Sequence, residues 1–208
     1  MSIDLRCFTY VNILQPQTAG FLGTVSQGYH PLENQSALFI EVSPGMDINI
    51  VTDIALKSTS VQPGMMIVER RYGALELHHE DQGQVHTAGE TILDQLGVQQ
   101  SDRLKPRIVS AQTLTGIEGY QSQLVNRMRH GNFLLENETL YVLEVHPAGY
   151  ALLAANEAEK AADINILEFR AVGAFGRVYL GGSEANIEEA AKAALNALAQ
   201  IEGRPNEG

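Results

Sequence analysis

The chain has 208 residues, of which 44% are hydrophobic and 19% are charged, a composition typical of globular proteins. Its formal net charge of −11 disfavours nucleic acid and anionic membranes as partners, because both need clustered Lys and Arg. No apolar run is long enough to span a membrane, and the first residues do not read as a signal peptide. The single cysteine, Cys7, allows no disulfide within the chain, which favours a reducing, cytoplasmic compartment and a buried thiol.

The sequence repeats itself with a constant offset. The segment ENQSALFIEVSP begins at Glu33, and ENETLYVLEVHP begins at Glu136, so that the offset is 136 − 33 = 103. The same offset continues on both sides without a gap, and it aligns Gly28 with Gly131, Ala55 with Ala158, Lys57 with Lys160, Gly73 with Gly176 and Leu77 with Leu180. The repeat predicts two domains of one fold, residues 1–103 and 104–208, joined by a polar linker near residues 101–107.

Both halves predict the same order of elements. Each begins with a β-branched and aromatic strand, LRCFTYV or RIVSAQTL, followed by a partly helical stretch. A short apolar strand then ends at a proline, and a helix follows at about residues 45–60 or 148–163. Two further strands joined by a turn lead to a closing amphipathic helix, whose apolar stripe in the second half begins at Ile187. Each half is therefore predicted to be an α+β layer, a small sheet with helices on one face.

The search for catalytic chemistry finds no convincing set of residues. No phosphate-binding loop, dinucleotide fingerprint or nucleophile motif is present, so that neither a cofactor nor an enzyme is predicted. The best metal candidate is the group His78, His79 and His86. Adjacent residues on a strand point to opposite faces, so that His78 and His79 do not readily share an ion, and a solvated strand end is the favoured interpretation.

One turn differs in kind between the two halves. The first half reads ERRYG from Glu69, whereas the corresponding stretch of the second half reads VGAFG from Val172. A charged turn is usually just a solvated hairpin. Duplicated domains can, however, form pseudosymmetric rings, in which symmetry brings such turns together at the centre.

The repeating frame resembles the bacterial microcompartment shell domain in its circularly permuted form, because the strand that usually ends the domain comes first in each half. The resemblance is to tandem permuted shell proteins of the carboxysome and covers nearly the whole chain. The segments that carry it are ERRYG, SPGMDINIVTDIALK, DRLKPRIVSAQ, LLENETLYVLEVHPA and ANEAEKAADINIL.

The resemblance implies two ferredoxin-like domains and a homotrimer that forms a pseudohexameric tile in the carboxysome shell, in contact with other shell proteins. It also implies a large pore on the threefold axis, gated by Glu69 and Arg70, and trimers that stack in pairs. The remaining pore-lining residues would be Arg71, Tyr72, Gly73, Gly173, Ala174, Phe175 and Gly176. Because guanidinium groups complement phosphates, we expect anions such as ribulose bisphosphate and phosphoglycerate to cross.

Two alternatives remain open on the sequence. Duplicated α+β domains of this size also build regulatory proteins that bind small molecules, which would require a saturable metabolite site. The second alternative is a shell trimer of a catabolic microcompartment.

Overall fold

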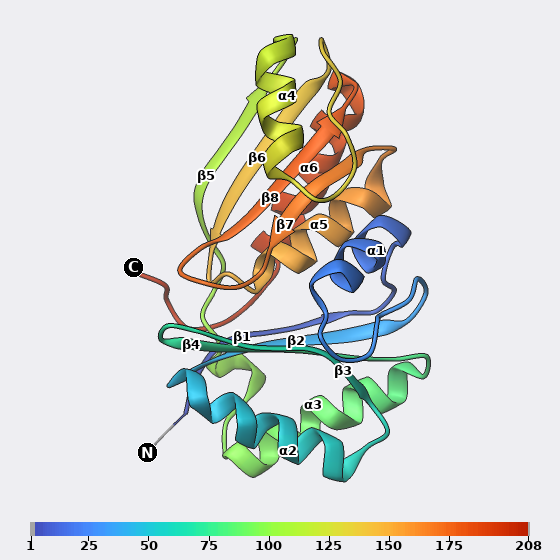
Figure 1. Ribbon diagram of the computed structural model, residues 1–208. Coiled ribbons are helices and arrows are strands. Elements are labelled where there is room, and N and C mark those ends of the chain that lie inside the picture. Colours follow the sequence, from blue (N-terminus) through green and yellow to red (C-terminus); the bar gives the residue numbers. More distant parts are fainter. Residues whose placement is uncertain (1–2, 208) are drawn as a thin grey trace.

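The computed structural model describes residues 3–207, which form two four-stranded antiparallel sheets and their helices (Figure 1). The elements of the first half are β1 (Asp4–Val11), α1 (Pro16–Val25), β2 (Ser36–Ser43), α2 (Ile48–Ser58), β3 (Gln62–Glu69), β4 (Tyr72–His79) and α3 (Gln82–Leu96). Those of the second half are β5 (Arg107–Leu114), α4 (Gly119–Met128), β6 (Thr139–His146), α5 (Tyr150–Ala161), β7 (Asn165–Arg170), β8 (Gly176–Gly182) and α6 (Glu184–Ala199). None of the helices in residues 3–207 is long and apolar enough to cross a membrane.

The two halves have the same fold, as the repeat predicts. The strand orders are β1-β2-β4-β3 and β5-β6-β8-β7, and both first strands carry an irregularity at the matching place. The repeat extends to single backbone angles, because Asn34 and Asn137 both have a φ of 68°. Asparagine tolerates this left-handed conformation better than most residues, which explains why it recurs in both copies.

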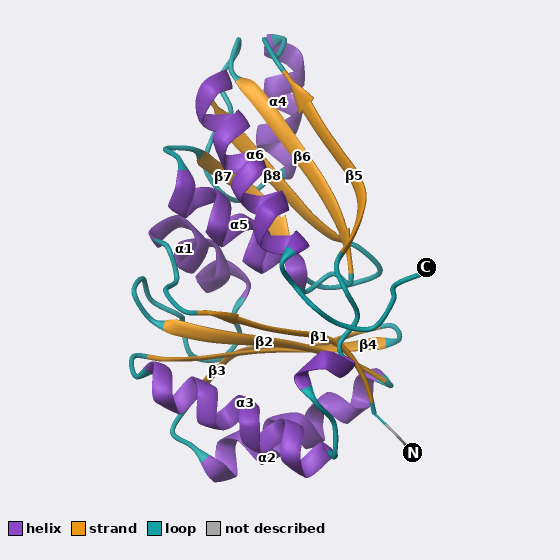
Figure 2. Cartoon of the chain, turned by 180° about the vertical axis from the view of Figure 1, so that it is seen from behind, coloured by secondary structure: helices purple, strands orange, loops and turns teal. Residues whose placement is uncertain are grey.

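The amphipathic helices form where the apolar spacing predicts them. In α3 the side chain of Asp81 accepts a hydrogen bond from the backbone N–H of Gly83 at 2.8 Å, and Gly97 ends the helix with a left-handed φ of 66°. In α6 the apolar stripe that begins at Ile187 is buried. Each of these helices packs beside the preceding one, α3 on α2 and α6 on α5 (Figure 2).

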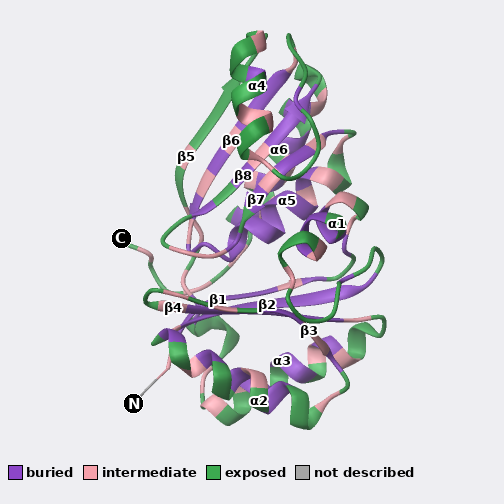
Figure 3. Cartoon of the chain, viewed as in Figure 1, coloured by how far each residue is buried: buried purple, intermediate pink, exposed green. Residues whose placement is uncertain are grey.

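The first sheet is covered on both faces, which differs from the one-sided layer expected. Its own helices α2 and α3 cover one face, and α1 together with α5 of the second half covers the other (Figure 1). A single large core therefore runs through the junction and includes Cys7, Phe39 and Tyr150, all fully buried. By contrast, β5 and α4 of the second half are largely exposed (Figure 3).

The polar segment that joins the halves is packed against both of them. Arg103 is only 8% exposed, and its guanidinium donates to the carbonyl oxygens of Phe8 and Glu202. The backbone N–H of Leu104 donates to the Arg6 carbonyl, and the C-terminal segment lies alongside through Arg204. The connection and the C-terminal residues thus tie the two halves together.

Candidate functional site: two facing turns

The turns that the sequence comparison singled out lie next to each other at one edge of the molecule (Figure 1). We call residues 69–72 the Arg loop and residues 171–176 the Gly loop. The Arg loop joins β3 to β4, and the Gly loop joins β7 to β8. They are linked by an ion pair between Glu69 and Arg170, 3.8 Å apart. Both side chains are partly exposed, so that this pair contributes little to stability.

The Arg loop is a tight two-residue turn whose conformation is unusual for its sequence. Glu69 and Tyr72 are paired in the ladder, and Arg70 and Arg71 form the exposed tip. Arg70 has a φ of 56°, in the left-handed region that glycine adopts freely and that costs a side-chain-bearing residue roughly 1–2 kcal/mol. The Arg71 guanidinium lies 5.9 Å from the centre of the Tyr72 ring.

The Gly loop uses its glycines in two different ways. Gly173 has a φ of 103°, a conformation that glycine adopts more readily than other residues. The next two residues, Ala174 and Phe175, are exposed. Gly176 allows a close approach instead, because it is buried and a Cβ there would lie 2.2 Å from the Ala148 carbonyl oxygen.

Gly73 in the first half is buried in the same way, with the Gly45 carbonyl oxygen 2.1 Å from the position of a Cβ. That Gly73 and Gly176 line an opening in a ring of chains stays a prediction. Both glycines lie behind the loops. There they allow β4 and β8 to lie close to the backbone of Gly45 and Ala148, respectively.

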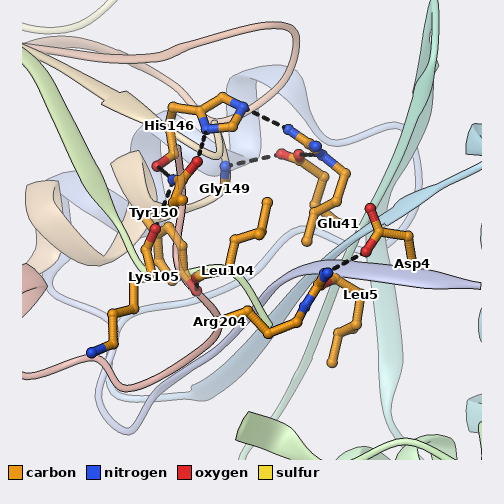
Figure 4. Close-up of polar contacts among 11 residues, drawn as sticks. Asp4, Leu5, Glu41, Leu104, Lys105, His146, Gly149, Tyr150 and Arg204 are labelled. Carbon is orange, nitrogen blue, oxygen red and sulfur yellow. Dashed lines mark hydrogen bonds and ion pairs between the residues drawn. The ribbon is translucent and has the colours of Figure 1, made fainter. Parts of the chain in front are cut away.

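Behind the loops, a polar cluster crosses the junction between the halves (Figure 4). Arg6 is the extra residue at the irregularity in β1, which turns its side chain toward the junction. Its Nε donates to Glu41 at 2.7 Å, and a terminal nitrogen lies 2.9 Å from Nε2 of His146. Its guanidinium also stacks on the Tyr72 ring, 3.6 Å from the ring centre.

Burial dominates the electrostatics of this cluster. Desolvation raises the pKa of Glu41, although Arg6 and the backbone N–H of Gly149 oppose the shift. The pKa of His146 is lowered, chiefly by desolvation and then by the positive charge of Arg6. Desolvation likewise raises the pKa of the Cys7 thiol, which is fully buried as predicted.

The candidate metal group is divided among different environments. His78 is fully buried, with Nδ1 3.1 Å from a Glu76 carboxylate oxygen, whereas His79 lies on the other face near Ser60. His86 stacks on the Tyr10 ring, with centroids 4.2 Å apart. Among residues 3–207, no three His, Cys, Asp or Glu side chains are grouped so that they could hold a metal ion.

Several residues of the site are not predicted by the sequence. Arg170 comes directly before the Gly loop, and Arg6 occupies an irregular strand position that the alternation of side chains does not reveal. His146 belongs to no partner pattern in the sequence. The available signal was Glu41, a carboxylate inside an otherwise apolar strand, because a buried charge requires a buried partner.

Comparison with known proteins places the chain in a family. The family model described as the CsoS1D N-terminal domain matches residues 5–102. Carboxysome shell protein CcmP of Synechococcus elongatus is 50% identical over 100% of this chain and 98% of its own length. Carboxysome shell protein CsoS1D of Prochlorococcus marinus subsp. pastoris is 46% identical, with 96% of this chain and 78% of that protein covered.

Solved structures agree with this assignment. The fused permuted hexameric shell protein MSM0275 from the RMM microcompartment matches with a TM-score of 0.94 and 46% identity, over 97% of this chain and 99% of that one. The double ringed trimeric shell protein MSM0271 from the same microcompartment has a TM-score of 0.94 and 36% identity, over 98% and 100% of the two chains. The chain therefore belongs to the family of carboxysome shell proteins with two tandem, circularly permuted microcompartment domains.

Proposed function

We propose that three copies of the chain form a pseudohexameric ring, a non-catalytic tile that lies beside other shell proteins in the carboxysome shell. The Arg and Gly loops would alternate around a central pore. The solved relative MSM0271 is described as a double ringed trimer, which is consistent with such a ring and with stacking in pairs. The argument from this chain itself rests on its internal repeat.

The junction inside one chain serves as a template for a junction between chains. Phe21 of α1 packs on Phe169 of β7, with ring centroids 4.7 Å apart. The offset of 103 maps this contact onto Leu124 of one copy and Met66 of a second copy. Both side chains are exposed in the single chain, Leu124 by 62% and Met66 by 43%. A ring would bury them together.

The observation that carries the proposal is a compensating change of size at a second pair of positions. Inside the chain, Gly149 lies so close to Phe39 and Cys7 that a Cβ would come within 2.7 Å and 2.9 Å of them. The matching residues are Met46 on one side and Val142 and Ser110 on the other. A large residue thus replaces the glycine where smaller ones replace its partners, and Met46 is 68% exposed. Such compensation is expected if Met46 packs against a second copy.

The chemistry of the pore follows from the loops. In the proposed ring, Glu69 and Arg70 act as the gate, which closes when they pair across chains and opens when the arms separate. The intrachain partner of Glu69, Arg170, adds a competing position for the same carboxylate. Arg71 and Tyr72 line the pore with the exposed part of the Gly loop. Arginines favour anions through charge-assisted hydrogen bonds, which supports sugar phosphates as the solutes.

The first experiment is a mass measurement by light scattering coupled to size exclusion. A mass of three chains supports the ring, and a mass of six supports stacked rings. A monomer at all concentrations contradicts the proposal. Binding of ribulose bisphosphate by calorimetry then tests the pore: Arg70→Ala should weaken it, whereas Lys192→Ala on the exposed face of α6 should not. Unchanged binding in Arg70→Ala would contradict the assigned solute.

A second candidate is a tile in a different microcompartment, because a solved shell protein of the RMM microcompartment is 46% identical. Purified shells distinguish the two. Recovery of the chain in the carboxysome fraction supports the proposal, and its absence there favours the second candidate.

A further inference from the structure

A continuous set of contacts joins the Arg loop to the Gly loop behind their tips. Tyr72 and Phe175 occupy matching positions of the repeat, one on each loop. Arg6 stacks on Tyr72 at 3.6 Å, and the ring of His146 lies at 62° to the Phe175 ring with centroids 6.0 Å apart. A 2.9 Å contact between Arg6 and Nε2 of His146 connects these two pairs of side chains. The order of contacts is therefore Tyr72, Arg6, His146, Phe175.

Arg6, in the middle of this set of contacts, is held in place by a buried ion pair with Glu41. Arg6 is 6% exposed and Glu41 is 1% exposed, and their 2.7 Å pairing satisfies two charges that water barely reaches. The other carboxylate oxygen of Glu41 accepts from the backbone N–H of Gly149 at 3.2 Å, across the junction. Removing one partner of a buried pair leaves an uncompensated charge, which is strongly unfavourable. Arg6 thus has one favoured position, beneath Tyr72.

The contacts of His146 define the tautomer of its neutral ring. Its Nδ1 lies 2.9 Å from Oδ1 of Asn206, whose amide nitrogen is already committed to the carbonyl oxygens of Lys105 and His146. Nδ1 must therefore carry the hydrogen, and Nε2 accepts from Arg6. A second proton on Nε2 would point at the guanidinium. The charged groups that act on the ring are Arg6 and Arg107, both of which favour its neutral form.

The set of contacts occurs in only one of the two kinds of junction. The positions that match Arg6, His146 and Asn206 are Val109, Ser43 and Arg103, which cannot reproduce it. The residue that matches Glu41 is Glu144, which pairs with Arg177 on its own sheet at 2.8 Å. In the proposed ring, the junctions within chains would contain the link and those between chains would lack it.

We propose that Arg6 and His146 are positioning residues that couple the Arg loop to the Gly loop of the same chain, so that the two loops move as one unit while His146 is neutral. Protonation of His146 releases the Gly loop from the Arg loop. In the proposed ring, the Arg loop and the Gly loop of one chain would form a pair, and each pair would move relative to the pairs of the neighbouring chains. This inference deepens the proposed function and rests on it for its meaning, although the contacts lie within one chain.

Spin labelling tests the coupling directly. A nitroxide is attached at Ala174→Cys in a Cys7→Ala background, and its mobility is read from the line shape. Tyr72→Leu removes the aromatic ring of the Arg loop that stacks on Arg6, and it should raise the mobility of the label. Tyr72→Phe keeps the ring and should leave the mobility unchanged. Equal mobility in labelled chains with Tyr72→Leu and in labelled chains that keep Tyr72 would overturn the coupling, since the two samples differ only at residue 72.

A pH titration tests the role of His146 with the same label. Mobility should rise as the pH falls from 8 to 5. In His146→Gln the side-chain oxygen can accept from Arg6 and the amide can donate to Asn206, so that these two polar contacts persist without a titrating group, although the ring contact with Phe175 is lost. A pH step of the same size in His146→Gln would overturn the assignment to His146.

Light scattering on the labelled samples separates the two proposals. Monomeric chains in which Tyr72→Leu still mobilises the label would contradict the ring and support the coupling. Trimeric chains in which it does not would do the opposite.

Discussion

Arg70 and Gly173 occupy matching positions of the repeat and share a left-handed backbone, with φ values of 56° and 103°. The first half has this conformation in a two-residue turn and the second half in a longer loop, and only the second half uses glycine for it. The first half keeps a long cationic side chain at a conformational cost of roughly 1–2 kcal/mol. Strain retained at an exposed turn supports the proposed role of this side chain at the gate.

Replacing Arg70 by glycine should therefore stabilise the chain. We expect Arg70→Gly to raise the free energy of unfolding by about 0.5–1 kcal/mol, because relief of the left-handed strain exceeds the greater freedom of glycine in the unfolded chain. Urea denaturation measures the change. Arg71→Gly serves as the control, since Arg71 has no positive φ and should lose stability. A loss of stability in Arg70→Gly would show that the turn is not strained.

A charge on the exposed face of α4 should prevent the ring from forming. Leu124→Glu places a carboxylate where the repeat predicts contact with Met66 of a second copy, so that the mass by light scattering should fall to that of one chain. Gln95→Glu, on the exposed side of α3, adds the same charge elsewhere and should leave the mass unchanged. A trimer that survives Leu124→Glu would refute the repeat-based contact.

The Glu69–Arg170 pair should matter for anions more than for folding. Both side chains are partly exposed, and such pairs contribute about 0.2–1 kcal/mol. Arg170→Gln should accordingly change the unfolding free energy by less than about 1 kcal/mol, while Glu69 becomes free to pair with Arg70 of another chain. Calorimetry should then detect weaker binding of ribulose bisphosphate. Unaltered binding would remove Arg170 from the gate.

Stability should depend on pH through His146. The folded chain lowers the pKa of this imidazole from its ordinary value of about 6.5, so that the unfolded chain binds the proton more readily. The contribution is complete above pH ~6.5 and is lost as the pH falls through the lower pKa of the folded state. The contribution of His146 is isolated by subtracting the unfolding free energy of His146→Gln from that of the original chain at each pH. The control is His30→Gln at an exposed position, which should not flatten the dependence of the unfolding free energy on pH. If the difference between the original chain and His146→Gln does not change with pH, this prediction is wrong.

The two matching positions Gly149 and Met46 should respond differently to alanine. Gly149→Ala forces a Cβ against Phe39 and the Cys7 sulfur, and we expect a loss of about 1–3 kcal/mol together with faster reaction of the Cys7 thiol with a disulfide reagent. Met46→Ala should leave the single chain nearly unchanged, because the side chain is exposed there, but weaken the trimer. Thiol kinetics and light scattering report the two effects separately.

The fold was accessible from the sequence, whereas the contacts behind the loops were not. The repeat and its apolar spacing predict the duplicated α+β halves, and ERRYG drew attention to Glu69 and Arg70. Periodicity describes one sheet at a time, however, so that it missed the covering of the first sheet by α5. Arg6 lies at a strand irregularity, where the alternation that predicts the direction of a side chain fails. The domain limits 1–103 and 104–208 and all the gating and pore-lining roles stay predictions.

The asymmetry between the two kinds of junction also affects how a ring would respond to dilution. The halves of one chain meet at an effective concentration set by their short covalent connection, so that the junction containing Arg6 and Glu41 forms whatever the amount of protein. The junction at Leu124 and Met66 depends on encounters between separate chains. Each dissociated copy would keep its Arg and Gly loops side by side. Reassembly would therefore need only to bring three such pairs of loops together around the pore.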